Sequence, residues 1–492
     1  MTDERRSDQE QVRLDKLRTL REQGVDPYPA QSKRTHTAGD VQVHFGQLAA
    51  GQEESAEVLL AGRLMAIRRS GKLVFADLHD ETGKIQILFS LGDVGAEQFA
   101  ALDLIDIGDI VNCAGHPLRT RRGELSLRAT SFTMLSKCLR PLPEKWHSLR
   151  DQETRFRRRY LDLMMNDDVR KQFHQRTLFV RTMRQVLDSA GFLEVETPIL
   201  EAVPGGADAK PFITHHNTLD INLFLRISLE LHLKRLIVGG FEKVYEIGRV
   251  FRNEGMSTEH LQEFTLMELY WAYADYHMLM EFIQDMYCRL IEAVNGSLSV
   301  RYGEQILDFT PPWPRVDYRE LIMSETGIDL DRLTDDRPLT NALEKGGIAP
   351  DVKLGRGRLI DQLYKRFCRP KMIQPCFLVN HPLAISPLAK SHPGKPSSVQ
   401  RFQILFAGSE VGNGYSELND PLDQAARFEE QAALRERGDD EAQMYDRDFV
   451  RALEYAMPPT AGFGVGLDRF LYILFNAPSI REVVFFPTLR PE

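Results

Sequence analysis

The clearest pattern of polar and apolar positions lies in residues 251–270, where two strand-like runs flank a polar, turn-prone segment. Residues two apart in a strand share a face, so Arg252 and Glu254 are predicted to point together from the first strand. Glu268 and Tyr270 are predicted to do the same on the returning strand. The pattern predicts a β-hairpin that carries charge where an apolar face is expected.

Such a charged face has two interpretations. Buried Arg and Glu side chains are costly unless they bind a partner. An arginine fork suits phosphate oxygens, and Phe264 could stack on a purine ring. The alternative is an exposed hairpin whose charges are simply solvated.

The first third of the chain is predicted to hold a helix and then a small barrel. Apolar residues at 12, 14, 17 and 20 form a helical stripe that ends before Gly24, within an N-terminal helical extension of residues 1–50. This helix either contacts nucleic acid or packs on its own domain. Short strands with glycine-bearing turns then predict an OB-type Greek-key barrel in residues 51–140, at 58–64, 73–78, 84–89, 107–111 and 124–129.

The middle strands of this barrel carry Phe75, Gln86 and Phe89 between basic loops. Aromatic and basic residues on one barrel face are typical of a platform for single-stranded bases. The alternative is that the aromatic rings fill the barrel core, and the sequence leaves both readings open.

Residues 141–170 are predicted to be a linker, with an arginine-dense helix at 153–162 that is either a solvated face or a phosphate contact. Residues 171–492 then alternate helix and strand, apart from an insertion at 300–375 that shows no motif. The elements predicted here are helices at 169–190, 230–238, 276–295 and 424–455, and strands at 192–198, 223–227, 377–379, 403–406 and 410–420.

The last motif is Gly464-Val465-Gly466-Leu467-Asp468-Arg469, which opens a helix. Alternating glycines let a strand or a ligand approach the backbone closely. Arg469 would lie in the first helical turn, where the helix dipole also favours anions.

Composition narrows the class of protein. A chain of 492 residues is expected to form two or three domains. A net charge of −9 excludes a uniformly basic nucleic-acid coat but permits the local basic clustering seen in the first third. No apolar run approaches the roughly 20 residues of a membrane span. The polar N-terminus and five cysteines without metal-site spacing favour a cytoplasmic protein with reduced thiols.

Three motifs, in order, carry a family resemblance. Residues 191–198 resemble the first signature motif of class II aminoacyl-tRNA synthetases, Phe251-Arg252-Asn253-Glu254 with Phe264 the second, and 464–469 the third. The barrel resembles that of the aspartyl, asparaginyl and lysyl subgroup, and stretches such as 204–220 and 414–424 resemble its lysyl-specific members. The resemblance implies an α+β fold with an antiparallel six- or seven-stranded sheet, flanking helices and an N-terminal OB-fold, assembled as a homodimer.

The resemblance also implies the reaction: lysine and ATP form lysyl-adenylate with Mg²⁺, and the lysyl group then passes to tRNA(Lys). Catalysis would rest on Arg252 and Arg469 through positioning and charge neutralisation. The ATP site it implies comprises Arg252, Glu254, His260, Phe264, Glu410 and Arg469, with Glu410 and Gln403 as metal ligands. The lysine site comprises Gly206, Glu230, Glu268, Tyr270, Asn413, Tyr415 and Glu417, and the anticodon site Phe75, Gln86 and Glu124.

Two positions depart from the family pattern. Glu259 stands where many relatives have an arginine, and Gln403 stands where relatives usually have an acid that helps hold Mg²⁺. Three rival functions follow: aspartyl or asparaginyl specificity, a non-catalytic paralogue that binds tRNA or lysine, and a ligase that charges a protein lysine. The acids of the predicted pocket disfavour the first, because they would repel a substrate carboxylate. Intact Arg252 and Arg469 disfavour the second, and the barrel disfavours the third.

Overall fold

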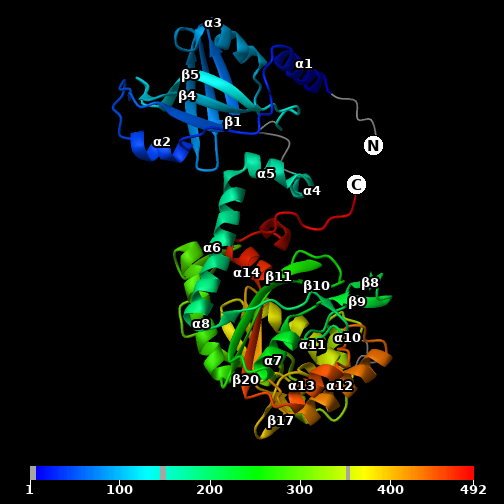
Figure 1. Cartoon of the computed structure of the whole chain (residues 1–492). Helices are drawn as coiled ribbons and strands as arrows, with labels where there is room; N and C mark the ends of the chain where they lie inside the picture. Colours follow the sequence, from blue (N-terminus) through cyan, green and yellow to red (C-terminus); the bar gives the residue numbers. More distant parts are fainter. Residues whose placement is uncertain (1–6, 144–150, 351–354, 492) are drawn as a thin grey trace. The chain divides into compact units, whose positions relative to one another are not determined.

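The computed structural model describes residues 7–143, 151–350 and 355–491, and the chain divides into two compact units, residues 1–150 and 151–492 (Figure 1). Residues 144–150 of the predicted linker and 351–354 of the predicted insertion lie outside the described residues. No helix in the described part of the chain is long and apolar enough to cross a membrane.

The first unit contains the predicted barrel. Five strands close in the order β1-β2-β3-β5-β4, and inward residues alternate with outward ones along β2 and β3. The inward side chains, such as Leu78 and Ile87, are fully buried. The elements are β1 (Val58–Ser70), β2 (Leu73–His79), β3 (Lys84–Ser90), α3 (Leu91–Ala101), β4 (Ile110–Arg119) and β5 (Leu125–Ser136). The prediction of a five-stranded barrel is confirmed.

The N-terminal helix packs on its own unit. In α1 (Asp8–Glu22), Leu17 and Leu20 are buried as predicted, whereas Val12 is 54% exposed. Arg13 is buried in its place and donates hydrogen bonds of 3.0 Å to the carbonyls of Cys138 and Ile107. The helix therefore covers the barrel, and a second helix, α2 (Ala38–Phe45), follows it.

The second unit is built on an eight-stranded sheet of order β14-β15-β18-β19-β20-β11-β10-β6. The six central strands are antiparallel, but β6 pairs parallel to β10 and β14 pairs parallel to β15, so the prediction of a purely antiparallel sheet is wrong at both edges. The strands are β14 (Arg315–Asp317), β15 (Cys376–Val379), β18 (Arg401–Phe406), β19 (Ser409–Ser416), β20 (Thr460–Gly466), β11 (Glu263–Ala272), β10 (Lys243–Phe251) and β6 (Leu193–Glu194).

Helices cover both faces of this sheet (Figure 1). One apolar cluster joins the sheet to α6 (Asp167–Ser189), α8 (Tyr276–Asn295) and α14 (Leu467–Leu474). Helix α8 buries nine side chains at helical spacing, which explains why its sequence pattern is so clear. A second cluster joins the other face to α7 (Glu230–Val238), α12 (Pro421–Glu436) and α13 (Arg447–Glu454).

The predicted strand 192–198 is shorter than expected. Only Leu193–Glu194 pairs with β10, because the Thr197 amide and hydroxyl both donate to the Glu246 carboxylate, at 3.0 and 2.7 Å. Pro198 has no amide hydrogen to continue the ladder. A small separate sheet follows, formed by β7 (Leu200–Glu201), β9 (Ile221–Leu225) and β8 (Ile213–His216).

The segment 300–375 is helical and has its own core. Its helices contribute buried Leu and Tyr side chains to a cluster that also takes in β15 and β18. The elements are β12 (Ser299–Tyr302), β13 (Gln305–Asp308), α9 (Tyr318–Thr326), α10 (Arg337–Lys345) and α11 (Gly355–Phe367). Shorter elements are β16 (Ser391–His392), β17 (Lys395–Val399) and 3-10 turns at Leu102–Leu104, Leu330–Arg332, Arg369–Lys371, Leu383–Ile385 and Ile480–Val483.

The arginine-dense segment forms two short helices, α4 (Gln152–Arg157) and α5 (Arg159–Met165). Arg159 is fully buried and bonds the Asp162 carboxylate at 2.6 Å and the Phe485 carbonyl at 3.1 Å. Arg155 pairs with Asp162 and Glu482. Both interpretations of this charge run are therefore wrong for Arg155 and Arg159, which anchor the C-terminal segment within the second unit.

Candidate active site

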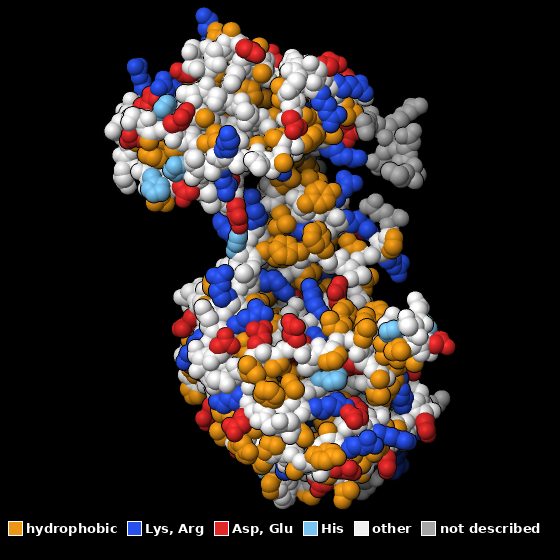
Figure 2. Space-filling model, in the orientation of Figure 1, with side chains coloured by type: hydrophobic (Ala, Val, Ile, Leu, Met, Phe, Trp, Pro, Cys, Tyr) orange, Lys and Arg blue, Asp and Glu red, His pale blue; other side chains and the backbone are white. Residues whose placement is uncertain are grey.

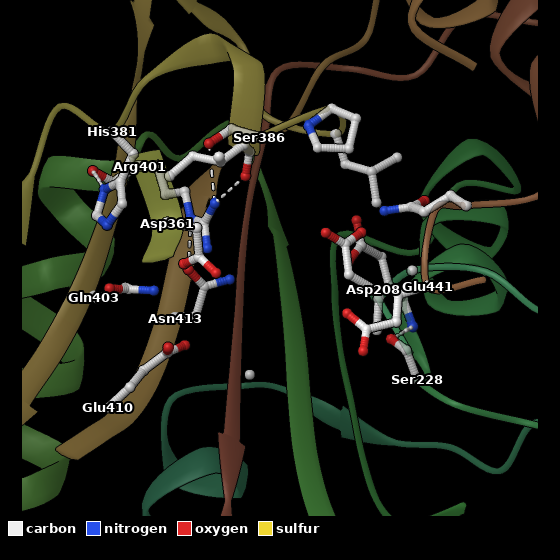
Figure 3. Close-up of a pocket in the computed structure, with 18 of the residues that line it drawn as sticks. Asp208, Ser228, Asp361, His381, Ser386, Arg401, Gln403, Glu410, Asn413 and Glu441 are labelled. Atoms are coloured by element: carbon white, nitrogen blue, oxygen red, sulfur yellow. Dashed lines mark hydrogen bonds between the residues drawn. The ribbon is translucent and has the colours of Figure 1, made fainter. Parts of the chain in front are cut away.

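A cavity of about 800 Å³ opens over the β10–β11 hairpin, β19 and β20. Its walls also include the first turn of α7, the N-terminal part of α11, the segment 384–389, and residues 430–443 in and after the C-terminal half of α12. Figure 3 shows Gln403, Glu410 and Asn413 along one wall and Ser228 on the opposite side. The cavity therefore brings together the hairpin and the two glycine-rich segments that the sequence singled out.

Arg252 and Glu254 lie in the hairpin loop and not in the strand as predicted. Strand β10 ends at Phe251, and the loop begins where the Arg252 amide donates to the Gln262 carbonyl at 2.8 Å. Arg252 is nevertheless held firmly, because its Nε donates to the Ile227 carbonyl at 3.2 Å. Its guanidinium carbon lies 5.1 Å from the centre of the Phe264 ring, at the distance of a cation–π contact.

A second guanidinium reaches the same end of the cavity. Arg469 extends from the first turn of α14, as predicted, and donates to the Glu410 carbonyl at 3.3 Å. The preceding residue fixes that turn, since Asp468 is fully buried and accepts from the Thr265 amide at 2.8 Å. Burial, aided by the positive charge of Arg469, lowers the pKa of Arg252. Two arginines so close together favour an anionic ligand.

The other end of the cavity is acidic. Glu268 is buried on β11, and its two oxygens accept from the Ser228 hydroxyl at 2.8 Å and the Tyr270 hydroxyl at 3.1 Å. Burial, with a smaller effect from the neighbouring Glu230 carboxylate, raises the pKa of Glu268 to about 7. The site therefore holds a carboxyl group that a cation would readily ionise.

Two further glutamates meet at a buried lysine. Glu230 Oε1 accepts from the Tyr415 hydroxyl and from Lys234 Nζ, each at 2.7 Å. The same ammonium forms an ion pair with Glu417 Oε2. Glu417 lies one layer behind the cavity wall, and its other oxygen, Oε1, is buried without a hydrogen-bond partner. Burial raises the pKa of Glu417 well above its usual range, although Lys234 opposes the effect.

Two glycines make this arrangement possible. Gly206 has φ +85°, and a Cβ there would lie 2.7 Å from the Ser228 hydroxyl oxygen. A Cβ on Gly462 would lie 2.1 Å from Glu417 Oε1, so only glycine leaves that oxygen room. The expectation that alternating glycines allow close approach is confirmed at Gly462.

The wall formed by β18 and β19 carries the predicted metal ligands. Gln403 is buried beside the Tyr364 hydroxyl, at 3.5 Å, and Glu410 is half-buried on the next strand (Figure 3). Asn413 accepts from Arg401 at 2.8 Å and also lines the cavity. Among the described residues, no three His, Cys, Asp or Glu side chains form a metal cluster. One carboxylate and one amide suit Mg²⁺, which commonly takes its remaining ligands from phosphates and water.

The hairpin loop supplies His260 and the unexpected Glu259, and both line the cavity. His260 Nδ1 is 2.7 Å from the Ser257 hydroxyl, and that hydroxyl also accepts from the Glu259 amide at 3.1 Å. These hydrogen bonds hold the loop together from within.

The three residues of the predicted anticodon site lie on the barrel unit. Phe75 and Gln86 point outward from β2 and β3 and are half-buried, and Glu124 is exposed. Phe89 is 1% exposed and packs in the core, as the alternative reading has it, whereas the side chain of Phe75 lies outside the core. Lysine and arginine side chains are interspersed with acids on the visible face of this unit (Figure 2).

Sequence reasoning missed the roles of Ser228, Lys234 and Arg401, which hold Glu268, Glu230 and Asn413. Lys234 follows Glu230 by four residues on one helix, and this spacing is a recognisable ion-pair signal. Ser228 and Arg401 have no comparable signal, because their partners are distant in sequence.

Comparisons with known proteins agree with this geometry. The family described as tRNA synthetases class II (D, K and N) matches residues 151–490, and an OB-fold nucleic acid binding domain matches residues 58–135. A lysine–tRNA ligase of Roseiflexus castenholzii is 51% identical, over 98% of this chain and 99% of its own. The lysine–tRNA ligases of Moorella thermoacetica and Bacillus subtilis are 48% and 46% identical, each over 98% of this chain and 97% of their own. The chain therefore belongs to the class II tRNA synthetases and, within them, to the lysine–tRNA ligases.

Proposed function

We propose that the cavity of the catalytic unit is where the protein, as a lysine–tRNA ligase, joins L-lysine to ATP and then transfers the lysyl group to tRNA(Lys). The observation that carries this proposal is the polarity of the cavity, with two arginines at one end and buried carboxylates at the other. A substrate with one carboxylate and two ammonium groups matches that distribution of charge.

Lysine would lie with its stem between the rings of Tyr270 and Tyr415. Glu230, with the backbone at Gly206, would receive the α-ammonium group, while Glu268 and Glu417 receive the ε-ammonium group. The orphaned Oε1 of Glu417 and the raised pKa of Glu268 support this orientation, because both are satisfied by a cation. Asn413 and Arg252 would hold the substrate carboxylate.

ATP would stack its adenine between Phe264 and Arg469, with Glu254 reading the base edge and His260 closing over the phosphates. The lysine carboxylate oxygen attacks the α-phosphorus, the bond to the bridging oxygen breaks, and pyrophosphate leaves. No enzyme nucleophile is needed. Arg252 and Arg469 neutralise the charge that develops on the phosphoryl oxygens, so that catalysis depends on positioning and electrostatics.

Magnesium would be held by Glu410 and Gln403 together with the phosphates of ATP. When bound, it would supply positive charge to the triphosphate. An amide ligand at Gln403 supplies no negative charge of its own, so we expect the metal requirement to be higher than that of an enzyme with two acids at this place.

The barrel would bind the anticodon of tRNA(Lys), with Phe75 stacking on a base, Gln86 bonding its edge and Glu124 contacting an outer base. Gln86 Oε1 already accepts from the Ser126 hydroxyl at 3.1 Å, which fixes the amide so that its donors face outward.

The protein would act as a homodimer in the cytoplasm. Strands β6 to β9 and their connections expose large apolar side chains close together in sequence, which in a monomer would face water. These exposed residues are Leu193, Ile199, Leu200, Ile213, Leu219 and Ile221, and part of this region faces the viewer in Figure 2.

Lysine-dependent ATP–pyrophosphate exchange without tRNA tests the assignment, with Mg²⁺ titrated and with aspartate and asparagine as controls. We expect exchange with lysine alone and a raised Mg²⁺ requirement. Exchange with none of the three amino acids, while tRNA still binds, would contradict the catalytic role and favour a regulatory protein.

A further inference from the structure

Lys234 lies behind the acidic end of the cavity and does not line it. Its side chain is fully buried, and its ammonium nitrogen is 2.7 Å from Glu230 Oε1 and ion-paired with Glu417 Oε2. Burial alone would lower the pKa of Lys234, but the two carboxylates outweigh burial and raise that pKa. The lysine is therefore a permanent cation inside the site.

This cation links two parts of the chain that have no other ion pair between them in the described residues. Glu230 opens helix α7, whereas Glu417 follows strand β19, 187 positions later in the sequence. The rings of Tyr415 and Phe449 lie 5.6 and 5.7 Å from the Lys234 ammonium and hold it from the sides. The separation of the two carboxylates is thus set by one enclosed ammonium group.

The charges in this end of the cavity do not balance without a ligand. Three glutamates, Glu230, Glu268 and Glu417, are at most 6% exposed, and Lys234 is the single lysine or arginine ion-paired with any of them in the described residues. Glu230 and Glu417 share this one cation, and Glu268 has no cationic partner in the described residues. Lys234 occupies only one oxygen of Glu417 and leaves Oε1 unpartnered beside Gly462. That oxygen is the point at which a ligand ammonium can bind.

We propose that Lys234 is a positioning residue that sets the length of the diamine accepted by the site. It holds Glu230 and Glu417 at a fixed separation, and, on the roles proposed above, these carboxylates receive the two ammonium groups of the substrate. Ornithine, one methylene shorter, cannot reach both. Because a shorter substrate leaves Glu417 Oε1 buried and unpaired, the penalty exceeds that of a missing methylene alone, which is on the order of 10-fold to 200-fold.

The test compares lysine with ornithine in ATP–pyrophosphate exchange by the full chain, for the wild type, Lys234→Met and Lys234→Arg. In Lys234→Met we expect KM for lysine to rise about 100-fold, KM for ATP to stay within about twofold, and the preference for lysine over ornithine to fall about tenfold. Lys234→Arg keeps the charge but changes its size, so it should retain exchange with lysine and still lose part of the preference.

Arg235→Met is the matched control. Arg235 is the next residue of α7 and also pairs with two acids, Asp446 and Asp448, neither of which lines the cavity. We expect this variant to lower the thermal midpoint without changing the ratio of kcat/KM for lysine to that for ornithine.

An unchanged ratio in both Lys234 variants, with KM rising equally for the two substrates, would overturn the proposal and leave Lys234 a packing residue. If Lys234→Met does not fold, Lys234→Arg decides by the same ratio. A wild type that shows no exchange with lysine would overturn the proposed function, and this inference with it. Exchange by the wild type with unchanged ratios overturns the inference alone.

Discussion

Among the described residues, each unit has a buried lysine that is paired with two carboxylates, and comparing the two clusters shows how their roles differ. In the barrel unit, Lys137 lies 2.8 Å from Asp109 and 2.5 Å from Asp106, and its side chain is fully buried. In the catalytic unit, Lys234 stands in the same relation to Glu230 and Glu417. The two clusters differ in whether the remaining carboxylate oxygens accept a hydrogen bond.

All the carboxylate oxygens of the barrel cluster have partners. Asp109 accepts from the Cys138 amide at 2.7 Å as well as from Lys137, and the second oxygen of Asp106 accepts from Lys16. In the catalytic cluster, Glu417 Oε1 has none. A buried ion cluster that satisfies every atom stabilises the fold, whereas one that leaves an atom unpaired is ready to bind. The two clusters are alike in the burial and charge of their lysines, and they differ in whether every carboxylate oxygen has a partner.

The largest effect that sharpens this comparison is expected for Lys137→Met. It leaves Asp109, which is fully buried, without its cation, and we expect the free energy of unfolding of the barrel unit to fall by about 3–5 kcal/mol. Denaturant unfolding of the full chain, followed by circular dichroism, measures this. Lysine-dependent exchange should persist wherever the chain remains folded.

Lys16→Met is the control for that measurement. Lys16 pairs with the same Asp106, but its side chain is 24% exposed, so its loss should cost no more than about 1 kcal/mol. Equal losses of unfolding free energy for the two variants would show that burial of Lys137 between two carboxylates adds no more stability than the partly exposed ion pair of Lys16.

The second expected effect is a pH dependence that the catalytic unit alone shows. The pKa of Glu268 is about 7 in the folded chain, against an ordinary value of 4.5. Unfolding therefore releases a proton between about pH 4.5 and 7, and the free energy of unfolding falls as pH rises through this window, by about 3 kcal/mol in total. Glu268→Gln should reduce this fall, and the part that remains is due to other buried acids such as Glu417, whose pKa burial also raises; denaturant unfolding at pH 5 and pH 8 measures the change.

Glu263→Gln is the matched variant on the same strand, since Glu263 is exposed and lies outside the cavity. It should keep the wild-type difference between the two pH values. If Glu268→Gln keeps that difference as well, the Glu268 carboxyl group is not the source of the pH dependence.

Local patterns predicted the fold well where elements carry their own signals. Helices 230–238 and 276–295 were placed at their observed bounds, because an apolar stripe defines each one and, for the second, Asp275 and Gly296 cap the two ends. The strand starts at Val58, Leu73 and Lys84 were also correct, since turns flank them. The segment 300–375 gave no prediction, because its helices bury their apolar stripes mainly against one another and against strands β15 and β18.

The family motifs pointed to the residues of the candidate site, and the alternation of polar and apolar positions described their local structure less well. Alternation extended the hairpin strand through Arg252, but the backbone leaves the ladder at Phe251. The role of Lys234 depends on Glu417, which is distant in sequence, and spacing along α7 reveals only its pairing with Glu230. Long-range partners of this kind follow from the packing of α7 on β10 and β11, which brings it close to the segment after β19 and which no local pattern records.

The barrel also offers a contrast within one pair of neighbouring strands, between Phe75 and Phe89. Phe89 is 1% exposed and packs edge-to-face on Phe132 at 5.7 Å, so Phe89→Ala should cost about 3–5 kcal/mol of stability. Phe75 is half-buried on the outer face, next to Gln86. If it stacks on an anticodon base, Phe75→Ala should weaken tRNA(Lys) binding by about 1–3 kcal/mol. Filter binding with the full chain measures this, and a loss of stability with unchanged tRNA affinity would instead make Phe75 a second core ring.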